Sequence, residues 1–236
     1  METDQNLSAL LEEQIAYYQA RASEYDEWFL RQGRYDHGAE HTAQWFAQVG
    51  QIQQALAEFQ PVGQVLEFAC GTGWWTEQLS RYADQITAVD ASSEVIALNQ
   101  ARLQSSGTVY HQSDIFAWQP NQAYDLVFFS FWLSHVPPEQ FEPFWHLVAR
   151  SLKPDGRVFF IDSQFEPSAT AKDHHLRSAK DTTTKRKLND GREFQIVKIF
   201  YEPSALTEKL SDLGWDIEIK ETPEHFIYGM GQRFRS

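Results

Sequence analysis

A glycine-rich turn has the residue spacing with the clearest chemical meaning in this chain. Residues 65–76 read VLEFACGTGWWT, so that Glu67, Gly71 and Gly73 stand between a short apolar run and an amphipathic stretch. Glycines let the backbone turn tightly and approach a ligand where a Cβ atom would collide. In α/β proteins, ligands bind beyond the carboxyl end of such a strand. The segment therefore predicts a strand, a ligand-binding loop and a helix, in that order.

Two features indicate which ligand suits this loop. A dinucleotide fingerprint has a third glycine three residues after the second, where this chain has Thr76. Glu67 would repel a pyrophosphate, whereas it would attract the sulfonium and the α-amino group of S-adenosylmethionine. The residue pattern therefore favours S-adenosylmethionine over NAD.

Further acidic residues follow the next two expected strands. Asp90 stands in AVDAS, and Asp114 stands in SDI. Together with Glu67, Gly71 and Gly73, they form an order of motifs that resembles the class I S-adenosylmethionine-dependent methyltransferases, whose first motif runs E/D-x-x-x-G-x-G. The interval from the first motif to Asp90 suits a ribose-binding acid.

The resemblance covers the chain from residue 60 to its C-terminus. The family's fourth strand is matched by YDLVFFS at 124–130, and its fifth follows the LKPDGR turn at 152–157. Residues 1–59 resemble only loosely the family's N-terminal lid. The resemblance implies an α/β, Rossmann-like fold with a mixed seven-stranded sheet in the order 3-2-1-4-5-7-6, a last strand that is antiparallel, and flanking helices.

The resemblance also implies which residues bind the methyl donor. Asp90 would hold the ribose hydroxyls, and Asp114 would lie beside the adenine. The donor would be S-adenosylmethionine, the product S-adenosylhomocysteine, and no metal ion is expected. The predicted donor site consists of residues at the ends of the first four strands: Glu67, Ala69, Gly71, Gly73, Trp74, Asp90, Ala91, Asp114, Ile115 and Ser130.

His135 is the candidate catalytic residue. It stands in SFWLSHVPP, after the expected fourth strand, where the family places residues that face donor and acceptor. An imidazole with a pKa near ~6.5 is able to remove a proton from an acceptor hydroxyl or amine at neutral pH. Two alternatives stay open: the side chain only closes the loop, or the acceptor is already ionised and alignment suffices.

Aromatic residues are concentrated in the N-terminal segment. Ring faces attract cations, so these side chains are candidates for a lid over the sulfonium or the acceptor, while helical spacing equally suits a core. The predicted substrate and lid residues are Tyr18, Tyr25, Trp28 and Trp132, and Tyr17 and Tyr35 are weaker candidates.

Two further patterns are candidate binding sites. His37 to His41 reads HGAEH and matches the H-x-x-E-H zinc pattern, but Gly38 weakens the helix that this pattern requires. We therefore expect no zinc site there. The basic residues at 172–180 and 185–187 are candidates for recognition of a carboxylate or phosphate on the acceptor, or simply form a solvated face.

Hydrophobic periodicity divides the chain into a helical N-terminal segment, residues 1–60, and an α/β domain, residues 61–236, with a hairpin inserted at about 163–200. Asp190 and Gly191 mark the turn of that hairpin. Helices are expected at 4–31, 42–59, 74–82, 93–104, 139–152 and 203–213. Strands are expected at 64–68, 85–89, 108–111, 124–131, 157–162, 182–188, 192–200, 215–220 and 226–228.

Composition narrows the functional classes. The chain has 236 residues and a formal net charge of −13, which disfavours binding of nucleic acids and of membrane surfaces. One cysteine, Cys70, rules out an intramolecular disulfide, and no apolar segment is long enough to span a membrane. We expect a cytoplasmic enzyme that methylates an oxygen or nitrogen of a small molecule. A methyltransferase acting on tRNA or protein, or a non-catalytic domain that binds S-adenosylmethionine, is the alternative, and the oligomeric state stays open.

Overall fold

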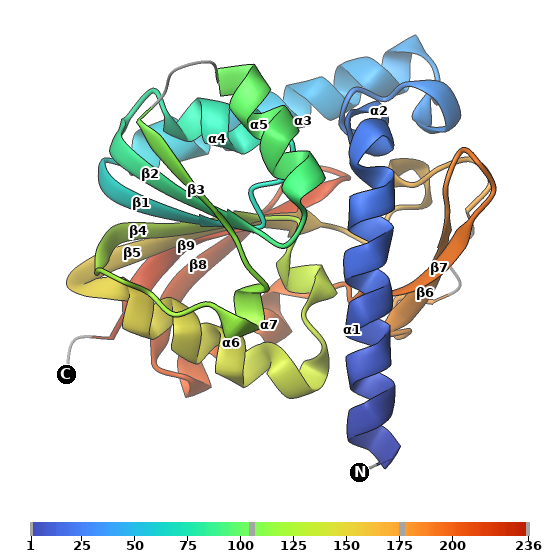
Figure 1. Cartoon of the computed structure of the whole chain (residues 1–236). Helices are drawn as coiled ribbons and strands as arrows, with labels where there is room; N and C mark the ends of the chain where they lie inside the picture. Colours follow the sequence, from blue (N-terminus) through green and yellow to red (C-terminus); the bar gives the residue numbers. More distant parts are fainter. Residues whose placement is uncertain (1, 104–106, 175–177, 235–236) are drawn as a thin grey trace.

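A mixed seven-stranded sheet forms the centre of the protein (Figure 1). The structure is a computed structural model that describes residues 2–103, 107–174 and 178–234. The strand order is β3-β2-β1-β4-β5-β9-β8. Strands β6 and β7 form a separate sheet, so β8 and β9 are the sixth and seventh strands of the main sheet and the expected order 3-2-1-4-5-7-6 is confirmed. Strand β9 is antiparallel to both of its neighbours. The strands are β1 (Gly63–Phe68), β2 (Ala83–Asp90), β3 (Thr108–Gln112), β4 (Tyr124–Ser130), β5 (Leu152–Ser163), β8 (Trp215–Glu221) and β9 (Phe226–Arg233).

Helices cover both faces of the sheet, as Figure 1 shows. One face is covered by α3 (Ala39–Phe59), α4 (Trp74–Leu79) and α5 (Ser93–Leu103), and the other by α6 (Pro138–Ser151) and α7 (Pro203–Asp212). Parallel strands that are buried on both faces have nearly continuous apolar sequences. In β4, Leu126 and Phe128 therefore belong to the core beneath α3 and α4, whereas Val127 and Phe129 belong to the core beneath α6.

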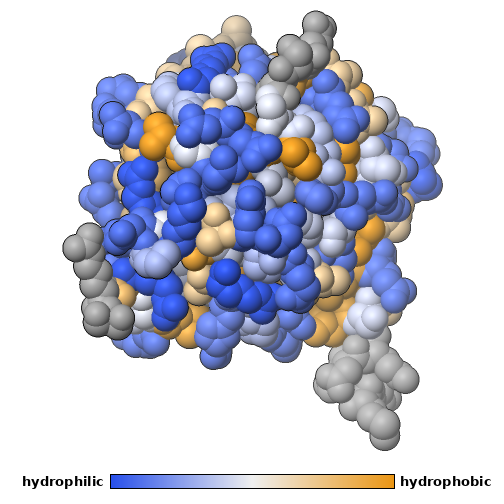
Figure 2. Space-filling model, turned by 60° about the vertical axis from the view of Figure 1, so that its left-hand side comes forward, coloured by the Kyte–Doolittle hydropathy of each residue, from blue (hydrophilic) through white to orange (hydrophobic). Residues whose placement is uncertain are grey.

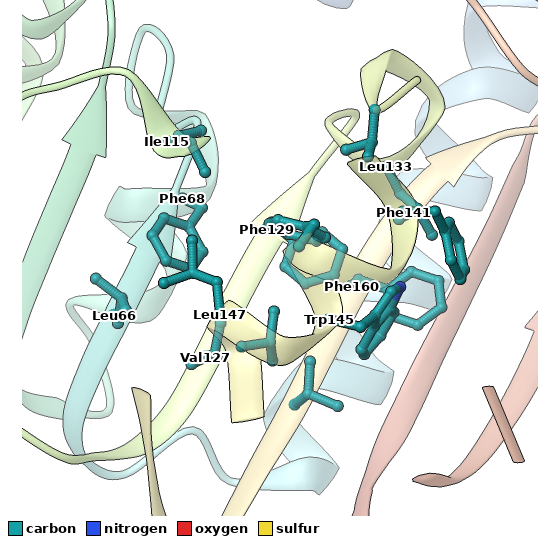
Figure 3. Close-up of a cluster of buried hydrophobic side chains, with 14 of the residues drawn as sticks. Leu66, Phe68, Ile115, Val127, Phe129, Leu133, Phe141, Trp145, Leu147 and Phe160 are labelled. Carbon is teal, nitrogen blue, oxygen red and sulfur yellow. The ribbon is translucent and has the colours of Figure 1, made fainter. Parts of the chain in front are cut away.

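The core beneath α6 is rich in aromatic rings (Figure 3). Phe129 on β4 and Phe160 on β5 stack with ring centroids 5.4 Å apart. Trp145 of α6 packs against Phe160 edge-on, at 5.9 Å between centroids. These buried rings hold α6 against the sheet. They therefore also hold the carboxyl ends of β4 and β5, which lead into the predicted site residues.

Several elements differ from the expected bounds, and β5, for example, begins at Leu152 rather than at residue 157. The helix expected at 4–31 is divided into α1 (Glu2–Arg21) and α2 (Tyr25–Phe29) by a 3₁₀ turn at Ala22–Glu24. Strand β9 continues to Arg233, although Gly229 and Gly231 interrupt its apolar pattern. Gly231 belongs in the strand because a Cβ atom there would collide with the backbone of Asp216 on β8.

The inserted hairpin packs against α1 rather than against the sheet. It consists of β6 (Thr183–Lys187) and β7 (Glu193–Val197), and Figure 1 shows it beside α1. Side chains of α1 pair with the free edge of β7, because Gln195 N donates to Glu13 Oε1 at 2.7 Å and Val197 N donates to Gln14 Oε1 at 3.0 Å. The helix therefore protects a strand edge that would otherwise be unpaired.

On the face seen in Figure 2, hydrophilic residues predominate and hydrophobic residues form scattered spots. Within the described ranges, no helix combines the length and the apolar character that crossing a bilayer requires.

Candidate active site

The glycine-rich loop connects β1 to α4 in a conformation that needs its small residues. Ala69, Gly71 and Gly73 have φ values of 51°, 52° and 94°, in the region that L-residues with large side chains avoid. A Cβ atom on Gly73 would lie 2.7 Å from Asn99 Oδ1 on α5. Gly73 therefore allows α5 to approach the loop closely.

A cavity, here called the loop cavity, opens in front of this loop. Its empty space is about 790 Å³ including the mouth, within the usual range for cofactor pockets. Its walls include seven of the ten predicted donor-site residues: Ala69, Gly71, Asp90, Ala91, Asp114, Ile115 and Ser130. Leu11, Gln14 and Ile15 of α1 also line it, so the N-terminal helix closes one side.

Asp90 lies at the end of β2 and is held by backbone donors. Its Oδ2 accepts a hydrogen bond from Gly71 N, and its Oδ1 accepts one from Ser92 N, both at 3.0 Å. Burial raises the pKa of the Asp90 carboxyl, and these N–H groups oppose that rise. Asp114 is held similarly, because its Oδ1 accepts from Phe116 N at 3.0 Å. Both carboxyl groups are thus oriented before any ligand binds.

Three predicted donor-site residues, Glu67, Gly73 and Trp74, do not line the loop cavity. Glu67 is only 1% exposed, and burial raises the pKa of its carboxyl to about 8. It is therefore mostly uncharged at neutral pH, and the attraction between Glu67 and a sulfonium stays a prediction. Trp74 points to the other side of the loop, where its ring stacks on Phe29 with centroids 4.8 Å apart.

A second cavity, here called the arginine cavity, adjoins the loop cavity. The two share Tyr18, Tyr25, Phe131 and His135 as a common wall. All the aromatic lid candidates of the N-terminal segment line the arginine cavity: Tyr17, Tyr18, Tyr25, Trp28 and Tyr35. Trp132, the remaining candidate, lines the loop cavity instead.

Three basic side chains face the arginine cavity from different elements. They are Arg21 at the end of α1, Arg186 on β6 and Lys198 after β7. Arg186 Nη1 donates to Thr170 Oγ1 at 2.8 Å, and Arg21 Nη2 donates to the Tyr35 hydroxyl at 3.4 Å. Among the described residues, no carboxylate forms a salt bridge with Arg21 or Arg186.

The other charged groups of this cavity reduce but do not cancel its positive charge. Lys198 Nζ lies 3.5 Å from Asp162 Oδ1 and donates to Ser134 Oγ at 2.8 Å. Burial lowers the pKa of Lys198 to about 8, so it is mostly protonated at neutral pH. Glu166 also lines the cavity, and its Oε1 accepts a hydrogen bond from Ser168 N at 2.9 Å.

His135 lies in the common wall with both ring nitrogens engaged. Its Nδ1 is 2.6 Å from the Val197 carbonyl oxygen, and its Nε2 is 2.8 Å from the Tyr18 hydroxyl. A carbonyl only accepts hydrogen bonds, so Nδ1 carries the hydrogen and Nε2 accepts the Tyr18 hydrogen. Burial, with Lys198 nearby, holds the pKa of His135 well below its usual range. The imidazole is therefore neutral at physiological pH.

The sequence reasoning identified only part of the basic cluster. Arg186 belongs to the basic stretch singled out at 185–187, but Arg21 and Lys198 were missed. Arg21 had a usable signal, since Tyr17, Tyr18, Arg21 and Tyr25 stand at helical spacing. The sequence contains no such signal for Lys198, because its neighbours in the cavity come from distant segments. Arg177, in the other basic stretch at 172–180, lies outside the described residues.

The histidines of the H-x-x-E-H pattern have protein partners. His37 Nε2 lies 3.2 Å from the Thr170 carbonyl oxygen, and His41 Nε2 lies 3.0 Å from Ser168 Oγ. In the portion of the chain that the structure describes, no three metal-ligating side chains converge on a point. These histidines connect the start of α3 to the segment around residue 169.

Comparison with known proteins shows the family. A family model described as "Methyltransferase domain" matches residues 65–156. The solved complex of DhpI with SAH is 36% identical, with a TM-score of 0.75, over 95% of this chain and 97% of that one. The complex of DhpI with SAM and HEP matches equally well, at 36% identity and a TM-score of 0.74 over 94% and 96% of the two chains. The chain belongs to the class I S-adenosylmethionine-dependent methyltransferases.

Curated relatives match more locally. The malonyl-[acyl-carrier protein] O-methyltransferase of Bacillus cereus is 29% identical over 67% of this chain and 56% of its own length. The trans-aconitate 2-methyltransferase of Escherichia coli O1:K1 / APEC is 34% identical over 48% and 45%. The chain thus spans about half the length of the curated relatives that it matches.

S-adenosylmethionine is the cofactor of this family, and the loop cavity fits it. Asp90 offers a carboxylate for ribose hydroxyls, and Ile115, Phe116 and Trp132 provide apolar surface for a planar base. The backbone at Gly71, without a Cβ atom, leaves space beside the ligand.

Proposed function

We propose that this protein transfers the methyl group of S-adenosylmethionine to an oxygen of a small anionic acceptor. The observation that carries the proposal is the pair of guanidinium groups of Arg21 and Arg186 in the arginine cavity, without carboxylate partners in the described chain. That cavity meets the loop cavity at the wall formed by Tyr18, Tyr25 and His135. An acceptor bound by the arginines would therefore lie next to a donor in the loop cavity.

The acceptor's charge follows from the cost of removing cations from water. A partly buried guanidinium without an anion loses hydration and gains little in return. A carboxylate or phosphate-type group would restore two hydrogen bonds per arginine and neutralise the charge. The positive cavity stands out in a chain with a net charge of −13, so it selects anions locally while the rest of the surface repels polyanions.

The reaction requires alignment more than proton transfer. The bound donor supplies an electrophilic methyl group on a sulfonium. An ionised acceptor oxygen forms the new C–O bond as the C–S bond breaks, and the S-adenosylhomocysteine sulfur takes the electron pair. Arg21 and Arg186 would hold the acceptor, and Asp90 would hold the ribose of the donor. Such positioning of two reactants supplies a large part of the rate enhancement.

The state of His135 favours the ionised acceptor over an acceptor that needs a base. A base at this position would have to collect a proton and become an imidazolium, buried beside Lys198. That charge is strongly disfavoured there. An amine or alcohol would lack a proton acceptor at His135, whereas a carboxylate or phosphate-type oxygen is already ionised at neutral pH. The similarity to the Bacillus cereus O-methyltransferase also supports oxygen as the acceptor atom.

An acceptor screen with methyl-labelled S-adenosylmethionine tests this function. The panel pairs each anion with a neutral isostere, such as a dicarboxylate with its diamide and a phosphate monoester with its alcohol. We expect methyl products only from the anionic members, identified by mass spectrometry. Methylation of the neutral members alone would contradict the proposal. Methylation of tRNA with a steep salt dependence, or donor binding without turnover on the whole panel, would favour the two alternative functions.

A further inference from the structure

Helix α5 holds the carbonyl groups of three consecutive residues of the glycine-rich loop. Asn99 Nδ2 donates to the carbonyl oxygens of Cys70 and Gly71, at 3.2 Å each. Arg102 Nε, one helical turn further along, donates to the carbonyl oxygen of Thr72 at 2.9 Å. These bonds point the three carbonyls toward α5. The loop's shape therefore depends on α5 as well as on its own glycines.

Asp26 of α2 connects the same loop to the N-terminal segment. Its Oδ1 accepts hydrogen bonds from Thr72 Oγ1 at 2.6 Å and from Trp74 Nε1 at 3.1 Å. Its Oδ2 forms a salt bridge with Arg102 Nη2. The Arg102 guanidinium also lies over the Trp74 ring, 4.2 Å from its centroid. The loop, α5 and α2 thus meet at one carboxylate.

The residue next to Asp26 lies at the junction of the two cavities. Tyr25 lines both the loop cavity and the arginine cavity, and its ring is 5.0 Å from the Arg21 guanidinium. The contacts of Asp26 therefore fix the position of this ring relative to the loop. Asp26 and Arg102 themselves line neither cavity.

We propose that Asp26 and Arg102 are a pair of positioning residues that hold the glycine-rich loop and the Tyr25 wall in one geometry. Donor binding at the loop then also orders the N-terminal wall of the acceptor site. This inference rests on the proposed function, because it takes the loop cavity as the donor site. The pair acts through Thr72, Trp74 and Tyr25 and does not touch either substrate.

A purely stabilising role would predict a different outcome. The side chains of Asp26 and Arg102 are 36% and 21% exposed, and ion pairs with such exposure contribute little to the stability of a fold. Removing the salt bridge alone, as in Arg102→Ala, should therefore change the melting temperature little, whereas Asp26→Ala also removes the acceptor of the Thr72 and Trp74 hydrogen bonds and should lower it. A positioning role should instead change the affinity for S-adenosylhomocysteine. It should also change how strongly S-adenosylhomocysteine protects the amides of the N-terminal segment from hydrogen exchange.

The test measures the dissociation constant of S-adenosylhomocysteine by calorimetry for wild type, Asp26→Ala, Arg102→Ala and the double variant. We expect each single change to weaken binding about 3–10-fold, and the double change to weaken it no more than the stronger single change, since the two residues act together. Glu218→Ala, which removes the exposed pair of Glu218 with Lys220 on β8, is the control and should bind like wild type.

Hydrogen exchange supplies the second readout. In the wild type, S-adenosylhomocysteine should slow amide exchange in both residues 69–76 and residues 25–35. In Asp26→Ala, protection should persist in the loop and be lost in the N-terminal segment. Asp26→Asn, which keeps an acceptor for Thr72 and Trp74 but removes the charge, gives the same comparison with less disturbance.

The outcomes separate this inference from the proposed function. Wild-type protein that does not bind S-adenosylhomocysteine would overturn the proposed function and this inference with it. Wild-type binding, combined with unchanged affinity and unchanged protection in Asp26→Ala and Asp26→Asn, would overturn this inference alone. Multiplicative losses in the double variant would show that the two residues act independently, which also contradicts it.

Discussion

The Tyr18 hydroxyl donates a hydrogen bond to His135 Nε2 at 2.8 Å, in the wall shared by the loop cavity and the arginine cavity. The two rings meet edge to face, with centroids 5.4 Å apart. Because His135 Nδ1 is bound to the Val197 carbonyl, the Tyr18 hydrogen is committed to His135. The Tyr18 oxygen is then able only to accept a hydrogen bond from a ligand.

This arrangement predicts a flat pH–rate profile. Burial keeps the pKa of His135 well below its usual range, so the imidazole stays neutral at physiological pH. The single-turnover rate with both substrates saturating should be constant from pH 6 to pH 7, below the pKa of about 8 of Lys198. Tyr18→Phe should lower the rate by less than about tenfold, compared with about 10²–10⁴-fold for the loss of a general base. A rate that rises through a pKa near 6.5, together with a hundredfold loss in the variant, would restore His135 as the base.

Asp90→Ala should weaken S-adenosylhomocysteine binding by about 1.5–3 kcal/mol, or roughly 10- to 150-fold. The carboxylate orients the loop through Gly71 N and would bind the ribose. Asp84→Ala, an exposed change at the opposite end of β2, is the matched control and should have no effect. Equal dissociation constants for both variants, measured by calorimetry, would remove Asp90 from the donor site.

Buried neutral histidines should make the protein less stable in acid. Burial lowers the pKa of His174 and of His225 to about 4, and that of His135 in the same direction. Between pH 4 and 6.5 the unfolded chain binds more protons than the folded one, so stability falls as the pH falls, by about 1.4 kcal/mol per pH unit for each group that titrates. Urea unfolding at pH 5 and pH 7 measures this difference.

Two substitutions locate the effect. His225 is fully buried, and its ring packs against Trp45, so His225→Phe should reduce the slope of stability against pH. The same change at the exposed His146 should leave the slope intact. A slope that is identical in both variants and in wild type would show that His225 does not contribute.

Glu67 should have the opposite pH dependence. Burial raises the pKa of its carboxyl to about 8, against about 4.3 for an unperturbed glutamate, so the folded state retains a proton that the unfolded state loses. This contribution to stability is lost as the pH rises through that interval. Glutamine has the shape of the protonated glutamate side chain but does not titrate. The free energy of unfolding of Glu67→Gln, relative to that of wild type, should therefore increase from pH 5 to pH 8. A constant difference across this range would mean that Glu67 is ionised in the folded protein.

Local patterns predicted most of the fold, because the signals involved are local. The turn at Asp190 and Gly191 and the apolar run of β4 need only neighbouring residues to be recognised. The strand order came from the family resemblance and is confirmed. The break in the N-terminal helix at Ala22–Glu24 was missed, since residues 4–31 continue the helical pattern and the contacts that bend the chain come from distant segments.

The site was less predictable for a physical reason. The positions of Asp90 and Asp114 follow from where strands end, which a sequence reveals. The protonation of Glu67 depends on burial, and the convergence of Arg21 with Lys198 depends on how α1 packs against β7. Neither property is encoded in the spacing of residues along the chain. Long-range packing, rather than motif identity, therefore determines the charge of the arginine cavity.

We expect the arginine cavity to bind an anionic methyl acceptor. Arg186 and Arg192 provide a matched comparison on the same hairpin, because Arg186 lines the cavity while Arg192 is exposed and paired with Asp190. The decisive measurement is the steady-state KM for the anionic acceptor found in the screen, determined for Arg186→Met and Arg192→Met. We predict an increase of about 10- to 100-fold for Arg186→Met, with the dissociation constant of S-adenosylhomocysteine unchanged, and a wild-type KM for Arg192→Met. A wild-type KM for folded Arg186→Met would contradict the claim.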